Sequence, residues 1–185
     1  MEAQKGVFSI REIAYIGIFV ALIAICSWIS IPTPTNIFFT LQTFAVCVVI
    51  GMLGMKRGTI AVVIYILVGL MGLPVFSGFK AGAGILFGAT GGYIIGFIFM
   101  ALLTGFVMDR FGQSIPVMTI AMILGLTICY LFGTVWYVTV YAGASGPVGF
   151  AAALGMCVVP YIIPDLVKIA LAILLVKRLR PYLHL

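Results

Sequence analysis

Long apolar runs, separated by short stretches of charged or turn-forming residues, dominate this chain of 185 residues. A transmembrane helix needs about 20 predominantly apolar residues, and the pattern divides the chain into about six such spans. The expected spans are Ile10–Ile31, Thr40–Met55, Gly58–Gly72, Ala89–Met108, Ile115–Tyr141 and Pro160–Val176. The second and third are short, so we expect tilting, local thinning of the bilayer or burial within the bundle to accommodate them.

These runs are continuous, as Ile60–Leu70 and Ile169–Val176 illustrate. A strand of a membrane barrel would instead alternate polar and apolar residues over about ten positions. Composition supports a lipid environment, because 64% of the residues are hydrophobic, 8% are charged and the mean hydropathy is +1.34. A soluble domain carries about 25% charged residues. The sequence predicts an all-α integral membrane protein, with one membrane domain over residues 1–185 and no soluble domain.

The first run is interpreted as a span and not as a signal peptide. It lacks a small-residue cleavage pattern, and it begins with both Arg11 and Glu12.

The net charge of +6 comes mainly from basic residues on one side of a chain with six spans. They are Lys5, Arg11, Lys56, Arg57, Arg110, Lys177, Arg178 and Arg180, whereas Lys80 falls in a loop on the other side and Lys168 within a span. Cytoplasmic loops carry such an excess of Lys and Arg, so both termini are predicted to lie in the cytoplasm. We expect no nucleic-acid partner.

The residues that several catalytic classes require are missing from the sequence. The cysteines have no C-x-x-C spacing and are predicted to be buried small apolar residues; they are Cys26, Cys47, Cys129 and Cys157. The only histidine, His184, is the penultimate residue, which excludes an intramembrane Ser–His protease and an H-E-x-x-H metalloprotease. Without a G-x-x-x-x-G-K-[ST] motif, ATP-driven transport would need another subunit to bind ATP. We expect no enzymatic activity, metal or cofactor.

Asp165 and Lys168 lie inside the last expected span. An ionisable group at the centre of a bilayer costs at least about 2.5–3.5 kcal/mol, so it usually faces a cavity and serves function. A spacing of three places both side chains on one helix face, where they partly offset each other. The pair is predicted to be functional; a pair that only locks helices together is the alternative. If the last helix starts near Pro164, both residues lie near its outer end.

The loop Leu73–Gly88 contains glycines at positions 78, 82, 84 and 88, with Lys80 at its centre. Such a segment can fold back as a re-entrant or lid segment where it lines a cavity. The alternative is a flexible loop with a solvated lysine.

Small residues recur at intervals of three and four along the first span, at Ala14, Gly17, Ala21 and Ala24, and along the fourth, at Gly92 and Gly96. Such faces let helices approach closely in lipid. We expect internal packing in the fourth span; in the first, internal packing and docking to another membrane subunit are both open.

Trp28 and Trp136 fall near the outer ends of their spans, and Tyr137 and Tyr141 lie close to the second tryptophan. An aromatic belt at the membrane interface and stacking on a ligand are both open interpretations.

Four short motifs occur in order along the chain. Thr40–Thr43 reads T-L-Q-T, Gly69–Phe76 reads G-L-M-G-L-P-V-F, Gly88–Tyr93 reads G-A-T-G-G-Y, and Pro164–Lys168 reads P-D-L-V-K. Together they resemble the BioY family, the biotin-specific S-components of energy-coupling factor (ECF) transporters. The chain departs from the family pattern at Asn36–Phe39, where P-V-P is common, at Ala89, which replaces a proline, and at Phe79–Lys80, where the loop is usually glycine-rich.

The resemblance implies a six-helix bundle in the cell membrane that binds biotin in an outward-facing pocket, formed by external loops and the last helix. Asp165 and Lys168 would contact polar groups of biotin, and Lys80 would take the ligand position of the loop; Gln42 and Tyr93 are further candidates. Whether Lys80 or Lys168 meets the biotin carboxylate is open.

The resemblance also implies partners. The small-residue face of the first helix would meet a transmembrane coupling subunit, which joins two cytoplasmic ATPase subunits. A self-sufficient secondary transporter, with Asp165 as its proton carrier, is the alternative function. A membrane enzyme or scaffold is a third class, for which the sequence offers no catalytic set.

Overall fold

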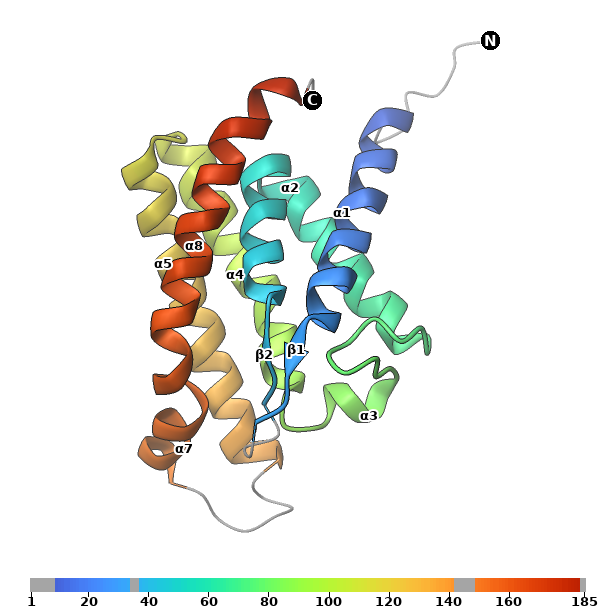
Figure 1. The fold of residues 1–185 in the computed structure, drawn as a ribbon, viewed down its shortest axis with the longest axis vertical. Helices are drawn as coiled ribbons and strands as arrows, with labels where there is room; N and C mark the ends of the chain where they lie inside the picture. The colour runs from blue at the N-terminus through green and yellow to red at the C-terminus, as the bar shows by residue number, and fades with distance from the viewer. Residues whose placement is uncertain (1–8, 34–36, 142–148, 184–185) are drawn as a thin grey trace.

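Helices run up and down the long axis of the molecule in a computed structural model that describes residues 9–33, 37–141 and 149–183 (Figure 1). In chain order the elements are α1 (Ile10–Trp28), β1 (Ser30–Ile31), β2 (Phe39–Thr40), α2 (Gln42–Leu70), α3 (Ala83–Leu86), α4 (Gly91–Phe111), α5 (Ile115–Trp136), the π-helical turn η1 (Tyr137–Tyr141), α7 (Phe150–Cys157), α8 (Val159–Leu179) and the 3-10 turn η2 (Arg180–Tyr182). Within these residues, five helices are long and apolar enough to cross a membrane. The predicted all-α membrane bundle is confirmed.

Helix α2 folds back on itself and so supplies two of the six expected spans. Its backbone leaves the helical conformation at Gly54, with φ 75° and ψ −177°. The side-chain nitrogen Nε2 of Gln42 lies 2.9 Å from the hydroxyl of Tyr65, whereas 23 residues of straight helix would separate them by about 35 Å. The legs 42–53 and 55–70 are therefore antiparallel (Figure 1). The turn comes at Gly54, slightly before the expected place, because a positive φ suits glycine.

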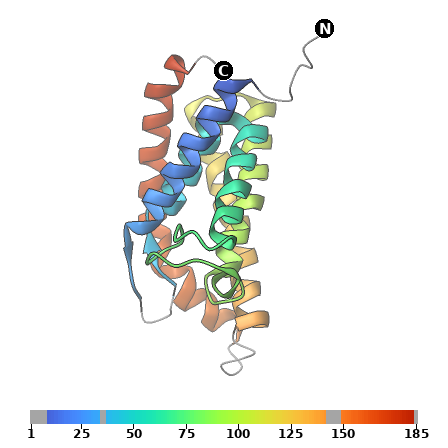
Figure 2. The ribbon, with the colours of Figure 1, turned by 90° about the vertical axis from the view of Figure 1, so that its right-hand side faces the viewer.

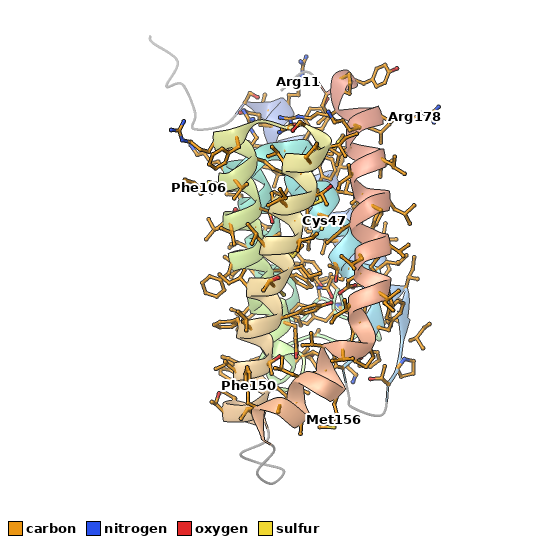
Figure 3. The ribbon with its side chains drawn as sticks, turned by 90° about the vertical axis from the view of Figure 1, so that its left-hand side faces the viewer. Arg11, Cys47, Phe106, Phe150, Met156 and Arg178 are labelled. Carbon is orange, nitrogen blue, oxygen red and sulfur yellow. The ribbon has the colours of Figure 1, made fainter. Side chains whose placement is uncertain are left out.

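The ends of the bundle differ in charge. The start of α1, the turn of α2, the α4–α5 connection and the end of α8 lie together at one end (Figure 1). Arg11 and Arg178 mark this end in Figure 3, while Phe150 and Met156 of α7 mark the other. For the described residues, the expected gathering of cations at one end is confirmed. Lys5 and His184 lie outside those residues, and the cytoplasmic orientation of this end stays a prediction.

Two helix boundaries differ from expectation. Helix α8 begins at Val159, not near Pro164, because Pro160 occupies the first turn, where a missing N–H costs nothing. Helix α1 ends at Trp28, and the expected end of its span at Ile31 belongs instead to β1. The two short strands pair antiparallel, with Ser30 opposite Thr40 and Ile31 opposite Phe39.

Close helix contacts explain the glycines of α4. A Cβ on Gly92 would lie 2.2 Å from Cβ of Trp136, and one on Gly96 would lie 3.0 Å from Sγ of Cys129. The expected internal packing of this face, against α5, is confirmed. The four cysteines are free and buried, also as expected.

The small-residue stripe of α1 is divided between two environments. Ala14, Gly17 and Ala21 are exposed, and a Cβ on Gly17 would have no atom within 4 Å. Ala24 is buried at 6% exposure and belongs to the core. Only the first three residues offer a surface to a partner.

Candidate binding pocket

A pocket with about 590 Å³ of empty space, part of it open to the surroundings, lies at the end of the bundle that carries α7. Its lining comes from the β1–β2 connection and β2, the loop 73–88, the residue before α4, and the helices α2, α4, α5, α7 and α8. The lining residues are Ile37, Phe38, Thr40, Gln42, Thr43, Ser77, Thr90, Tyr93, Ile94, Phe97, Leu126, Cys129, Tyr130, Cys157, Tyr161, Asp165 and Lys168.

A buried ion pair forms the polar centre of the pocket. Nζ of Lys168 lies 2.7 Å from Oδ1 of Asp165, and the residues are only 5% and 3% exposed. The hydroxyl of Tyr130 on α5 donates to Oδ2 of Asp165 at 2.5 Å. The ammonium of Lys168 also lies over the ring of Phe39, 4.1 Å from its centroid. The prediction that Asp165 and Lys168 share one helix face is confirmed.

The T-L-Q-T motif starts α2 and places Gln42 in the pocket wall. Oγ1 of Thr40 accepts the backbone N–H of Gln42, the first residue of α2, at 3.1 Å. Nε2 of Gln42 donates to the hydroxyl of Tyr65, and this hydroxyl donates to the carbonyl of Val75 at 3.0 Å. The amide is thereby oriented, and its oxygen remains an acceptor for a ligand.

Tyr93, at the start of α4, lines the same pocket. Its hydroxyl lies 3.3 Å from Oγ1 of Thr134 on α5. Four of the five predicted binding residues therefore line one pocket: Asp165, Lys168, Gln42 and Tyr93.

Lys80 lies in an adjoining hollow of about 640 Å³, which shares Phe38, Ser77, Thr90 and Ile94 with the main pocket. Its ammonium lies 4.9 Å from the centroid of the Phe38 ring. Phe38 and Lys80 thus meet at the boundary of the two hollows. Both belong to segments where the sequence departs from the motif pattern.

The loop 73–88 packs onto the bundle as an ordered cover (Figure 2). Phe76 is fully buried and meets the ring of Tyr65 edge-on, with 5.7 Å between the centroids. A Cβ on Gly69 would lie 2.2 Å from Cζ of Phe76, so the glycine of the G-L-M-G-L-P-V-F motif makes room for its phenylalanine. The backbone N–H of Gly82 donates to the carbonyl of Gly69 at 2.8 Å. Lys80 itself is exposed, so the alternative of a solvated lysine is still open.

Trp28 holds the same loop from the end of α1. Its indole N–H donates to the carbonyl of Pro74 at 2.7 Å, and its ring stacks on Phe79 with centroids 5.1 Å apart. Phe79 adopts φ 56°, a left-handed conformation that is unfavourable for a bulky residue. The aromatic stack helps to keep it there. Trp28 is therefore a clamp on the loop and is not among the pocket-lining residues.

Trp136 is likewise engaged with protein. Its ring packs between Phe87 and Phe132, with centroid distances of 6.3 Å to each, and it covers Gly92. Neither tryptophan stacks on the space that a ligand would fill.

Two tyrosines of the site were not predicted from the sequence. Tyr130 stands in the middle of an apolar run, and no local signal separates it from the other tyrosines of the spans. Tyr161 lies four residues before Asp165, so helical spacing already placed it on the same face. Its hydroxyl donates to the carbonyl of Ile37 at 2.6 Å and lies 3.3 Å from Oγ1 of Thr33, which ties the β1–β2 connection to α8.

The pocket has the character of a binding site. Burial raises the pKa of the Cys157 thiol, on α7, to about 11, so this thiol is protonated at neutral pH. Among the residues that the structure describes, no cluster of His, Cys, Asp or Glu is suited to hold a metal ion. An acid–base pair, hydroxyl donors and aromatic walls can hold a ligand that is polar at some edges and apolar elsewhere.

Comparison with known proteins shows which family the chain belongs to. The model of the BioY family matches residues 1–184. The chain belongs to the BioY family. As a member of this family it is a multi-pass protein of the cell membrane and not an enzyme, and the resemblance drawn from four motifs is confirmed.

Individual relatives agree with this BioY assignment. The chain is 39% identical to the biotin transporter BioY of Thermotoga maritima over 170 residues, which cover 92% of this chain and 96% of the relative. It is 35% identical to the probable biotin transporter BioY of Pyrococcus horikoshii, with the same coverage. A crystal structure of the S-component for biotin from an ECF-type ABC transporter superposes with a TM-score of 0.85 and 27% identity, over 97% of this chain and 95% of that one.

Proposed function

We propose that this chain captures biotin from outside the cell as the substrate-binding subunit of an ATP-driven ECF transporter. The observation that carries the proposal is the buried Asp165–Lys168 pair, held by Tyr130 in a pocket with both polar and apolar walls, in a member of the BioY family. A buried ion pair is a poor device for stability alone, because desolvation of both charges offsets their attraction. Its place in a pocket is explained if it binds a ligand.

Biotin matches the chemistry of the pocket. Its ureido group has two N–H donors and one carbonyl, its ring body is apolar, and its tail ends in a carboxylate. Each carboxylate oxygen of Asp165 has one protein donor and retains a second lone pair for a ureido N–H. Lys168, which uses one of its three N–H donors on Asp165, can donate another to the ureido carbonyl. The ring body would lie against Phe97 and Leu126, which line the same pocket.

The carboxylate tail is assigned to Lys80. Lys168 is already neutralised by Asp165 at 2.7 Å and covered by the ring of Phe39. Lys80 lines the adjoining hollow, where a tail that leaves the main pocket past Phe38 would end. A carboxylate and an ammonium form a charge-assisted hydrogen bond, which is about twice as strong as a neutral one.

The test is calorimetry on the purified chain in detergent, without ATP or any partner. Biotin should bind with a stoichiometry of one, because the pocket is built entirely from this chain. Thiamine and riboflavin at the same concentrations serve as competitors and should not displace it. Binding of either vitamin in place of biotin would reassign the substrate.

ATP hydrolysis is assigned to partner subunits, because the sequence has no P-loop motif. We propose that the exposed part of the α1 stripe, at Ala14, Gly17 and Ala21, docks a transmembrane coupling subunit that joins two cytoplasmic ATPases. Small residues let a partner helix approach closely, and Gly17 has free space in front of it.

The docking surface is tested with Gly17→Leu combined with Ala21→Leu. Both positions are exposed, so the larger side chains do not clash within the bundle. Biotin binding should stay normal, while co-purification with the coupling subunit and ATP-dependent uptake should be lost. Ala170→Leu, at an exposed alanine of α8, is the matched control and should transport normally. Normal transport by the double variant would place the docking surface elsewhere, and uptake that needs a proton gradient but no ATP would favour a secondary transporter.

A further inference from the structure

A further hollow, of about 600 Å³ including space open to solvent, lies at the cationic end of the bundle, away from the proposed biotin pocket. The α4–α5 connection, the first turn of α5, the last turn of α8 and η2 surround it. The residues that line it are Gln113, Met118, Val176, Lys177, Arg180 and Pro181.

The hollow combines a cationic rim with an apolar floor. Lys177 and Arg180 contribute two positive charges, and Gln113 contributes an amide; no carboxylate belongs to the lining set. Met118 and Val176, at 0% and 1% exposure, form the apolar floor. Such a surface suits a ligand with an anionic head and an apolar body.

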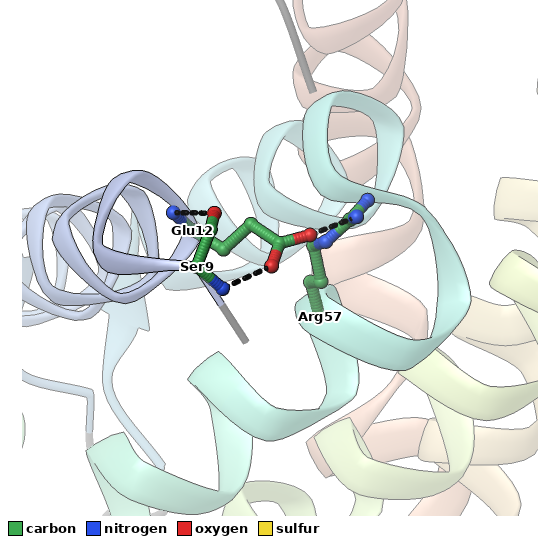
Figure 4. A network of polar contacts seen from close by, with 3 residues as sticks. All are labelled: Ser9, Glu12 and Arg57. Carbon is green, nitrogen blue, oxygen red and sulfur yellow. Dashed lines mark hydrogen bonds and ion pairs between the residues drawn. The ribbon is translucent and has the colours of Figure 1, made fainter. Parts of the chain in front are cut away.

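Two carboxylates lie near this rim, and one of them, Asp109, interacts electrostatically with Arg180. Glu12 and Asp109 lie in a neighbouring hollow that shares Arg180. Glu12 forms an ion pair with Arg57 and accepts the backbone N–H of Ser9 at 2.7 Å (Figure 4). Asp109 accepts the backbone N–H of Met55 at 3.4 Å. Over residues 9–183 as described, this end carries seven Lys and Arg side chains against these two carboxylates, and the excess favours an anionic ligand.

The depth of the hollow also points to lipid. It lies where α5 begins and α8 ends, which is the level of the lipid headgroups around a spanning bundle. Tyr182, at 76% exposure, stands at the same end and is a typical interfacial residue. Leu171 and Leu174, at 53% and 65% exposure, continue an apolar surface along α8 below it. Basic pockets of this kind between membrane helices suit anionic lipid headgroups.

We propose that this hollow binds the headgroup of an anionic phospholipid. Lys177 and Arg180 hold the phosphate through charge-assisted hydrogen bonds, Gln113 donates through its amide, and the acyl chains lie on the apolar surface of α8. Free inorganic phosphate carries the same charged group but has no apolar part to lie on Met118 and Val176, so the site is assigned to lipid.

The experiment compares lipid binding by the purified wild type and three variants in detergent, with phosphatidylglycerol as probe and phosphatidylcholine as the zwitterionic reference. Lys177→Gln with Arg180→Gln removes the rim charges. Arg110→Gln with Arg178→Gln removes two exposed cations from the same end, outside the hollow. The rim variant should lose phosphatidylglycerol affinity by roughly thirtyfold, since each basic residue near a membrane surface contributes about a factor of five. The control variant should lose much less, and Lys177→Arg should retain the affinity of the wild type.

Four results would overturn the proposal. The first is an equal loss of affinity in both double variants, which would mean that the lipid is attracted by the charge of the whole end. The second is equal binding of phosphatidylcholine, and the third is displacement of the lipid by equimolar inorganic phosphate. The fourth is undiminished lipid affinity in a rim variant that no longer co-purifies with the coupling subunit, which would make the surface a protein contact. Thermal unfolding in detergent checks that each variant is folded. If the rim double variant unfolds, Lys177→Gln alone, at an exposed position, carries the test with an expected fivefold loss.

Discussion

The molecule contains two ion pairs whose surroundings differ sharply. The side chains of Lys168 and Asp165 are 6% and 4% exposed, and they lie within one helix at the wall of the pocket. The side chains of Arg57 and Glu12 are 32% and 17% exposed, and they join α2 to α1 at the cationic end (Figure 4). The first pair has a third partner in Tyr130, whereas the second is completed by the capping box of α1.

The contrast indicates that the two ion pairs have different roles, one in ligand binding and the other in joining two helices. A buried pair is costly to desolvate, and its strength depends on complete hydrogen bonding, so its environment must be built for it. A pair at the surface is screened by water and salt and adds little to stability. We therefore expect substitutions in the Asp165–Lys168 pair to affect ligand binding strongly, and substitutions in the Glu12–Arg57 pair at the cationic end to have small effects.

The largest effect is expected for Asp165→Asn. The substitution removes the negative charge that pairs with Lys168 and that we propose to accept the N–H groups of biotin, and a hydrogen bond to a charged group contributes about 1.5–3 kcal/mol. Biotin affinity should fall by roughly ten- to a hundredfold, measured by calorimetry.

The control for this variant is Asp165→Asn combined with Lys168→Met. Removing both charges relieves the unpaired ammonium, so the unfolding temperature should return toward that of the wild type. Biotin binding should stay weak. Wild-type affinity in the single variant would mean that the pair only holds the helices together.

A packing contact at the same end gives the next effect. Gly69→Ala places a Cβ 2.2 Å from the ring of Phe76, so the loop 73–88 must move away from α2. Overpacking of this kind costs about 1–3 kcal/mol, which should appear as a lower unfolding temperature in detergent. Gly84→Ala, in α3, has no atom within 4 Å and is the matched control. Equal unfolding temperatures for the two variants would show that the loop is not held by Phe76.

Much of this architecture follows from local chemistry that the sequence displays. The apolar runs predicted the spans, because a chain segment in lipid must satisfy its own backbone hydrogen bonds and therefore forms a helix. The positions of the basic residues predicted the cationic end. The spacing of Asp165 and Lys168 was enough to place them on one face. Gly54 was harder to recognise as the turn of α2. The charged residues Lys56 and Arg57 mark the end of an apolar run more clearly, and a glycine inside a span can equally serve close helix packing.

The rest depends on contacts between distant segments. Tyr130 reaches Asp165 across 35 positions, and Trp28 reaches Pro74 across 46, and neither pairing has a periodic signal. The same holds for α3, α7 and the strand pair, which are short and are shaped by what they cover. Ala24 shows that residue spacing alone does not decide whether a helix face is exposed. It is buried because the end of α1 packs into the core, where Ser27 donates to the carbonyls of Ala24 and Val75.

Tyr130→Phe should have a smaller effect than Asp165→Asn. It removes one donor to Asp165 but keeps the ring and the ion pair with Lys168. A net hydrogen bond contributes about 0.5–1.5 kcal/mol, so biotin affinity should fall by roughly two- to tenfold. Tyr182→Phe, at an exposed tyrosine of the other end, is the control and should bind normally. A hundredfold loss in Tyr130→Phe would instead make the tyrosine a direct ligand contact, equal in weight to the carboxylate.

The smallest effect is expected for Glu12→Gln, which tests the other side of the comparison. Glutamine can still accept the backbone N–H of Ser9, as a capping box requires, so the substitution removes only the charge that faces Arg57. Because the pair is partly exposed and screened, the unfolding temperature and the biotin affinity should both match the wild type, at low and at high salt. Ser9→Ala is the informative control, since loss of an N-cap costs about 1 kcal/mol and should lower the unfolding temperature even though no charge changes. A clear loss of stability in Glu12→Gln that disappears in high salt would mean that the cationic-end pair holds α1 against α2, and the contrast between the two ion pairs would no longer stand.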